Sequence, residues 1–176
     1  MCGITGLLEK ICGPNPAGYS AIALFNKTDI TTLPAPVGVT GIATADIVMV
    51  ATKKGFEIPF TEETGEFDEP LDGEVDAQTV KTMIKFGVAG RTAATVAKIQ
   101  QMIGGRYVAV ITFQDGTKVI VGSLVTPLRL KKADFKSGAY GSTARKGFEF
   151  ELGCASAIYA YQYGGVYDDT IVTVGN

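Results

Sequence analysis

Apolar and polar residues alternate most clearly over residues 75–90, which predicts a long strand with one buried face. The two faces separate cleanly, with Val80, Ile84, Phe86 and Val88 on one and Thr79, Lys81 and Lys85 on the other. Such a strand is expected to lie with its apolar face on a core and its polar face in water.

Further extended segments predict a β-rich chain. Residues 19–26 are expected to form a strand, 46–52 and 56–61 a hairpin around Lys53-Lys54-Gly55, and 106–113 and 118–124 a hairpin around Asp115-Gly116. Shorter strands are predicted at 127–130, 148–152 and 171–174, with 157–163 extending the strand at 148–152. The segments 31–41 and 131–146 are polar or rich in Gly and Pro, and are expected to be loops.

One helix is predicted over residues 92–103. Thr92 is a suitable N-cap, and Gly104-Gly105 can supply a left-handed C-cap. An apolar stripe at helical spacing is formed by Ala93, Val96, Ile99 and Ile103. Many strands and one helix indicate a mainly β fold, either a β-sandwich or a barrel with one packed α-helix.

The domain organisation expected from this pattern is a single β domain over 1–176. Residues 1–45 are expected to form an N-terminal arm or extension, with a short helical turn at 7–11, and residues 55–76 an acidic hairpin or loop. Charged residues make up only 19% of the chain and hydrophobic residues 46%, so we expect apolar surface that is hidden in contacts between subunits.

Candidate chemistry is sparse. The chain has no His, which removes the usual general base near neutral pH and the commonest metal ligand. Cys2, Cys12 and Cys154 match no zinc or disulfide spacing and are expected to be free thiols in a reducing compartment. We therefore expect no catalytic residue, no cofactor and no metal. No signal peptide and no apolar run of roughly 18–20 residues is apparent, so synthesis in the cytoplasm and no membrane span are expected.

The start Met1-Cys2-Gly3-Ile4 resembles that of class II glutamine amidotransferases. In that family the initiator Met is removed and the exposed Cys is the nucleophile, with its own α-amino group as base. The resemblance implies this role for Cys2. The glutamine-binding segments of the family have no counterpart in this chain, so the enzyme is kept only as an alternative from a different functional class.

Charge is segregated along the chain. Every charged residue between positions 55 and 80 is acidic: Glu57, Glu62, Glu63, Glu66, Asp68, Glu69, Asp72, Glu74 and Asp76. This block predicts a solvated loop, a Ca²⁺ or Mg²⁺ site, or an acidic surface that repels DNA or meets a basic loop of another subunit. The basic counterpart is 131–146, with Lys131, Lys132, Lys136, Arg145 and Lys146. Opposite patches on one chain favour head-to-tail association into rings or tubes.

Aromatic residues suggest two further surfaces. Phe135 and Tyr140, within the basic segment, are candidates for stacking on DNA bases. Tyr159, Tyr161 and Tyr163 are expected to share one face of a strand and to pack in the core or in an interface.

In its order of parts, the C-terminal two-thirds of the chain resembles a phage tail tube protein, and more distantly the tube proteins of injection systems. The parts are the strand at 75–90, the helix at 92–103, the hairpin at 106–124 and the strands at 127–130 and 148–152. The segment 46–76 would be the long hairpin that reaches a neighbouring ring. The resemblance implies a virion protein without catalytic residues, and it implies a homo-oligomer of stacked rings with six copies to a ring. DNA would pass through the lumen without specific binding, and other tail or connector proteins would be partners. A connector, a tail terminator or another injection-system subunit is the alternative in the same class.

Overall fold

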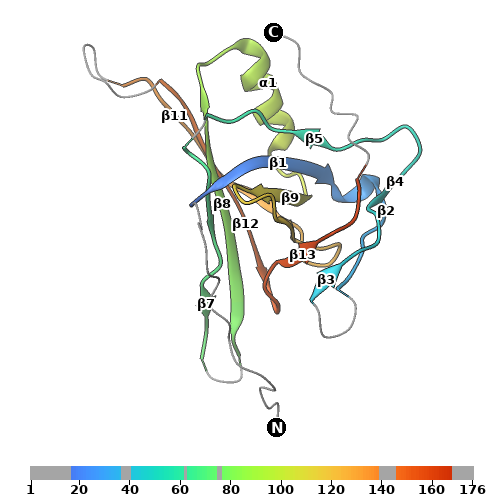
Figure 1. Cartoon of the computed structure of the whole chain (residues 1–176). Coiled ribbons are helices and arrows are strands. Elements are labelled where there is room, and N and C mark those ends of the chain that lie inside the picture. Colours follow the sequence, from blue (N-terminus) through green and yellow to red (C-terminus); the bar gives the residue numbers. More distant parts are fainter. Residues whose placement is uncertain (1–16, 37–40, 62, 75–76, 139–145, 168–176) are drawn as a thin grey trace.

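The computed structural model describes residues 17–36, 41–61, 63–74, 77–138 and 146–167. The fold is mainly β with one α-helix, as expected from the sequence (Figure 1). In chain order the elements are β1 (Tyr19–Asn26), a 3-10 turn (Lys27–Asp29), β2 (Ile30–Thr32), β3 (Ile42–Ala43), β4 (Val48–Met49), β5 (Phe56–Glu57), β6 (Glu66–Asp68), β7 (Leu71–Asp72), β8 (Thr79–Ala89), α1 (Ala93–Met102), β9 (Tyr107–Phe113), β10 (Lys118–Val121), β11 (Arg129–Lys136), β12 (Gly147–Ser156) and β13 (Tyr161–Tyr163).

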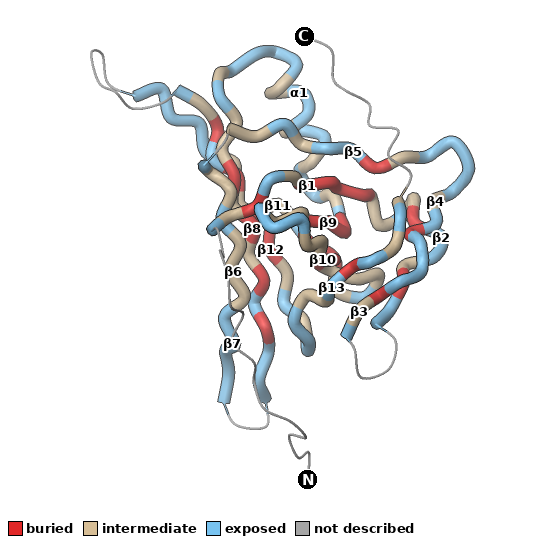
Figure 2. The backbone as a smooth tube through the Cα atoms, in the orientation of Figure 1, coloured by how far each residue is buried: buried red, intermediate tan, exposed pale blue. Residues whose placement is uncertain are grey.

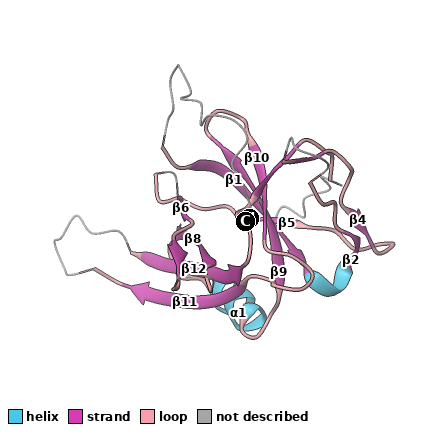
Figure 3. Cartoon of the chain, turned by 90° about the horizontal axis from the view of Figure 1, so that it is seen from below, coloured by secondary structure: helices cyan, strands magenta, loops and turns pink. Residues whose placement is uncertain are grey.

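Two sheets account for most of the strands. One has six strands in the order β3-β13-β10-β9-β1-β5, and the other has five, in the order β11-β12-β8-β6 with β7 also on β8. All pairings in these sheets are antiparallel except that of β13 with β3. In Figure 3 the strands β8, β11 and β12 lie together on one side and β1, β9 and β10 on the other. Within the part of the chain that the structure describes, neither sheet closes on itself, so the fold is a sandwich and not a closed barrel.

The main core lies between the two sheets. Ile84 of β8 and Leu152 of β12 are fully buried there, and they share one apolar cluster with Ile22 and Ile111 of the six-stranded sheet. Partly buried side chains of α1, namely Val96, Ile99 and Met102, pack against the same cluster. The amphipathic helix is therefore held by its apolar side on the sandwich core.

A second apolar cluster covers the other face of the six-stranded sheet. Phe25, Val108 and Val110 point into it and meet Ile47, which lies in the segment before β4. Because both faces of this sheet are covered, the central strand β9 is buried without alternation from Tyr107 to Ile111 (Figure 2). A continuous apolar run is what such a doubly covered strand requires.

The strand predicted at 75–90 is present as β8 and has the expected faces. Val80, Ile84 and Phe86 are buried, whereas Thr79 and Lys81 are exposed. The Asp115-Gly116 hairpin between β9 and β10 is also confirmed. Gly116 has φ +84°, and the Asp115 carboxylate accepts a hydrogen bond from the Thr117 amide at 2.8 Å.

The helix is confirmed, but two positions of its apolar stripe were wrong, Ala93, which is exposed, and Ile103. The Thr92 hydroxyl caps the first turn by accepting from the Thr95 amide at 3.0 Å, and Gly104 is left-handed at φ +78°. Ile103 is 67% exposed, because the helix ends at Met102 and Ile103 has extended backbone angles. Met102 occupies the packing position instead.

The predicted hairpin of 46–52 with 56–61 is wrong. β4 pairs with β2, and β5 pairs with β1, so the two segments join different sheets. The acidic segment 55–76 is not a free loop either, since β6 and β7 within it both pair with β8. The long hairpin predicted at 46–76 is therefore wrong, because the strands β4 to β7 of this segment pair with other strands of the same chain.

Two segments near the C-terminal end also differ from expectation. Residues 131–136 are strand, not loop, because β11 pairs with β12 along its length. The strand at 148–152 does not extend through 157–163: β12 ends at Ser156, and β13 joins the other sheet. Tyr159 consequently lies outside any strand and is 52% exposed, whereas Tyr163 is buried.

The arm expected at 1–45 does not include residues 19–26, because β1 is an interior strand between β5 and β9. Its Phe25 is fully buried. Residues 1–16, with the helical turn predicted at 7–11, lie outside the described residues, as does the strand predicted at 171–174.

Candidate functional site

Among the described residues, the five-stranded sheet has two borders without a further strand, and they carry opposite charge. One border is the segment 66–74, which contains β6 and β7 and carries five acidic residues and no basic one: Glu66, Asp68, Glu69, Asp72 and Glu74. We call it the acidic border. The other is β11, with four basic residues, Arg129, Lys131, Lys132 and Lys136, and one acidic residue, Asp134. We call it the basic border. The structure thus places part of each sequence-predicted charge block at opposite edges of one sheet.

The outward face between these borders carries a row of alternating charge. The strand registers place Lys132 opposite Glu151, Glu151 opposite Lys85, and Lys85 opposite Glu66. The Lys85 ammonium lies 3.2 Å from the Glu66 carboxylate and 3.4 Å from that of Asp68. These carboxylates favour the charged ammonium and raise the pKa of Lys85. Exposed cross-strand pairs contribute at most about 1 kcal/mol each, so this row specifies pairing more than it adds stability.

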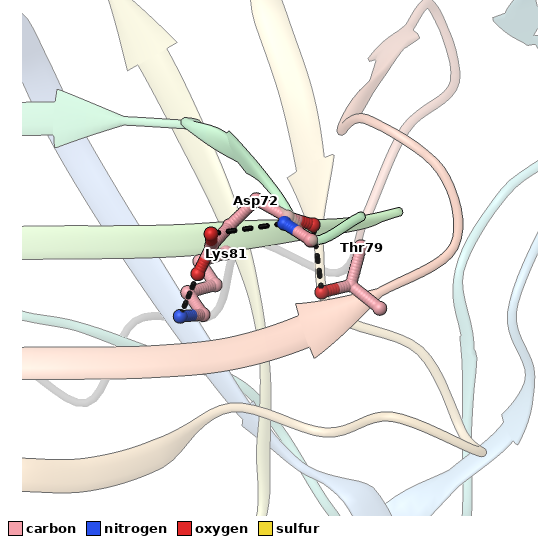
Figure 4. A network of polar contacts seen from close by, with 4 residues as sticks. Asp72, Thr79 and Lys81 are labelled. Atoms are coloured by element: carbon pink, nitrogen blue, oxygen red, sulfur yellow. Dashed lines mark hydrogen bonds and ion pairs between the residues drawn. The ribbon is translucent and has the colours of Figure 1, made fainter. Parts of the chain in front are cut away.

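The outer end of the acidic border is ordered by a local polar network (Figure 4). The Asp72 carboxylate is paired with the Lys81 ammonium and accepts a hydrogen bond from the Gly73 amide at 2.9 Å. The contact with Lys81 lowers the pKa of Asp72. In Figure 1, β7 and the first residues of β8 project beyond the rest of the body. The projection therefore presents the Asp72 carboxylate, held in place by Lys81 of the same chain.

Glu69 has an internal role that the sequence did not indicate. Its Oε1 atom accepts hydrogen bonds from the Thr82 hydroxyl at 3.0 Å and from the Ala160 amide at 2.8 Å. Thr82 is a buried polar residue on β8, and Ala160 follows β12. Glu69 thereby fixes the acidic border to the segment that connects the two sheets. No local signal distinguishes it from its acidic neighbours, because Ala160 is distant in the sequence.

The hypothesis of a Ca²⁺ or Mg²⁺ site in the acidic block gains no support. Among the described residues, no group of three or more Cys, Asp or Glu side chains is close enough together to hold a metal ion. Several of the acids are instead engaged with lysines of β8, as described above.

The aromatic candidates separate in space. The Phe135 ring packs 5.1 Å from that of Phe148, and the Arg91 guanidinium lies 5.6 Å from the Phe135 ring centroid. Phe135 is thus engaged with its own chain, although it remains 36% exposed. Tyr140 lies outside the described residues.

Of the three cysteines, only Cys154 falls within the described residues, where it is half-buried on β12 opposite Thr82. Burial raises the pKa of its thiol, which keeps it protonated and weakly nucleophilic. Cys2, the residue of the amidotransferase alternative, and Cys12 lie outside the described residues.

No helix in the described part of the chain has the length and apolar character needed to cross a membrane. Comparisons of the chain with protein-family models, with curated proteins and with solved structures give no match.

Proposed function

We propose that this protein is a non-catalytic structural subunit that assembles head-to-tail with copies of itself. The observation that carries the proposal is the pair of borders on the five-stranded sheet, one acidic and one basic. A contact between unlike patches is heterologous, so each copy keeps one patch free for the next. Such contacts close into rings or continue as filaments.

The strand directions are compatible with this contact. β11 and β8 run in the same direction, and β6, β7 and β12 run in the opposite one. When a second copy in the same orientation approaches the acidic border, its β11 lies antiparallel to β6 and β7. The sheet is then continued with the antiparallel pairing that it already has, and the unpaired backbone groups of an edge strand gain partners.

Exposed apolar side chains offer further surface for contacts between subunits. Val48, Val50 and Val166 are each at least 44% exposed and line one shallow groove. Leu71 is 49% and Ile158 58% exposed, and the register of Leu71, Val80 and Ser156 places both near one end of the five-stranded sheet. Assembly would remove such groups from water.

The specific role we propose is that of a phage tail tube subunit, with rings of six copies that stack into a conduit for DNA in the virion. The support is the sequence resemblance together with a mainly β sandwich that has one helix and an extendable sheet. Self-contact would be accompanied by contacts with other tail or connector proteins. A connector, terminator or injection-system subunit is the alternative with the same assembly chemistry.

Negative-stain electron microscopy and light scattering of the purified full chain test the proposal. We expect rings or tubes at low salt and a marked loss of assembly near 1 M NaCl, where the screening length falls to about 3 Å. Rings that stack into tubes would favour the tube role, whereas rings that stay single would favour a connector. A chain that stays monomeric in low salt at high concentration would overturn the proposal.

A further inference from the structure

We propose that, between adjacent copies, Glu66 pairs with Lys132 and Asp68 with Arg129. This inference rests on the proposed self-assembly and names the contact that would carry it. It adds the register and the polarity of the interface, which the existence of two charged borders does not determine.

The register within one copy supplies the argument. Two successive outward-facing rows cross the whole sheet: Lys132, Glu151, Lys85 and Glu66 form one, and Arg129, Gly153, Met83 and Asp68 form the other. Each row therefore begins with a base on the basic border and ends with an acid on the acidic border. If the next copy is placed beside the first without an axial shift, both rows continue with opposite charges adjacent.

A shift between copies would break this match. Moving the neighbour by two residues in one direction brings Asp134 opposite Glu66, and like charges directly opposite are unfavourable. Moving it in the other direction places Arg129 opposite Glu66 and leaves Lys132 with no acid opposite it, so only the unshifted register keeps both pairs. The charge pattern therefore selects one register among those that backbone pairing alone would permit.

The side chains concerned are available for a second partner. Although both carboxylates contact Lys85, the Glu66 side chain remains 57% exposed and the Asp68 side chain 41% exposed. Lys132 lies 3.2 Å from Asp134 of its own strand and is 44% exposed. Each carboxylate has several acceptor sites, so a neighbouring base can bind without displacing Lys85.

Two double variants test both the residues and the polarity. Glu66→Lys with Asp68→Lys places lysines opposite Lys132 and Arg129 of the next copy, and Arg129→Glu with Lys132→Glu places glutamates opposite Glu66 and Asp68. We expect each variant alone to associate at least about tenfold more weakly than the natural chain, because like charges would face each other. An equimolar mixture is expected to assemble in alternation, and the chain carrying all four changes is expected to assemble by itself.

Lys98→Glu with Arg106→Glu is the matched control for the second variant, because it has the same charge change on exposed residues away from both borders. Circular dichroism and thermal unfolding show whether each variant is folded. If a reversed variant does not fold, Glu66→Gln with Asp68→Asn replaces it, and assembly at low salt is expected to weaken.

The outcomes separate this inference from the proposed function. If the natural chain assembles but the folded variants assemble equally well, or the mixture stays apart, the proposed pairs are wrong and self-assembly stands. If the natural chain does not assemble under any of these conditions, the proposed function fails and the pairing fails with it.

Discussion

The Tyr19 hydroxyl donates a hydrogen bond to the Lys85 carbonyl oxygen at 2.8 Å, and this contact joins the two sheets of the sandwich. Tyr19 lies on β1 and is 2% exposed, while Lys85 lies on β8, whose outward side chains carry the charged row. The position of the charged sheet relative to the core is therefore fixed in part by one buried phenol.

Replacing Tyr19 with Phe removes this hydrogen bond and leaves the ring in place. We expect the free energy of unfolding to fall by about 1 kcal/mol, since a buried acceptor loses its donor. Urea denaturation measures the change. Tyr159→Phe, at a half-exposed residue, is the control and is expected to have little effect.

Alkaline pH is expected to destabilise the fold through the same residue. Burial raises the pKa of Tyr19 well above its ordinary value of about 10. Above pH 10 the unfolded chain loses a proton from Tyr19 that the folded chain keeps. The contribution of Tyr19 to the free energy of unfolding is therefore fully present below this pH and is lost as the pH rises. The fall attributable to Tyr19 is about 1.4 kcal/mol per pH unit. Unfolding at pH 8 and 11 should show a shallower decline in Tyr19→Phe than in the natural chain; equal slopes would contradict this assignment.

Glu69→Ala tests the link between the acidic border and the turn after β12. The change leaves the buried Thr82 hydroxyl and the Ala160 amide without their acceptor, and we expect a loss of about 1–3 kcal/mol. Glu69→Gln retains an acceptor oxygen and should cost less. Glu74→Ala, an exposed acid of the same border, should stay within about 0.5 kcal/mol. If chemical denaturation shows equal effects for Glu69 and Glu74, the internal role of Glu69 is wrong.

Gly147→Ala tests the close approach of β12 to β8. A Cβ atom at Gly147 would lie 2.5 Å from the Val88 carbonyl oxygen, and a backbone atom in a paired strand cannot easily move away. We expect a loss of about 1–3 kcal/mol in thermal or urea unfolding. Gly164→Ala is the control, because its nearest neighbour would be the Ile42 methyl group at 3.6 Å. Similar stability of the two variants would argue against tight pairing at Gly147.

Local patterns predicted the elements whose partners are close in the chain. The alternation of β8, the Asp115-Gly116 hairpin and the Thr92 cap each depend on backbone preferences or on neighbours within a few residues. β11 was missed because its Lys-rich sequence has low strand preference, and its extended form is stabilised by pairing with β12. The partners of β4 and β5 were missed because each pairs with a strand on the far side of a loop.

The amino-acid sequence by itself determined that this chain is β-rich with one helix, and that acids and bases lie in separate blocks. Only the tertiary structure decided that segments of those blocks form opposite borders of one sheet, with Glu66 and Lys132 at the two ends of one row. The physical reason is that strand order and register are set by burial of side chains from distant segments in a shared core. The pattern along the chain predicts which face of each strand is buried, but it does not predict which strand lies next to it.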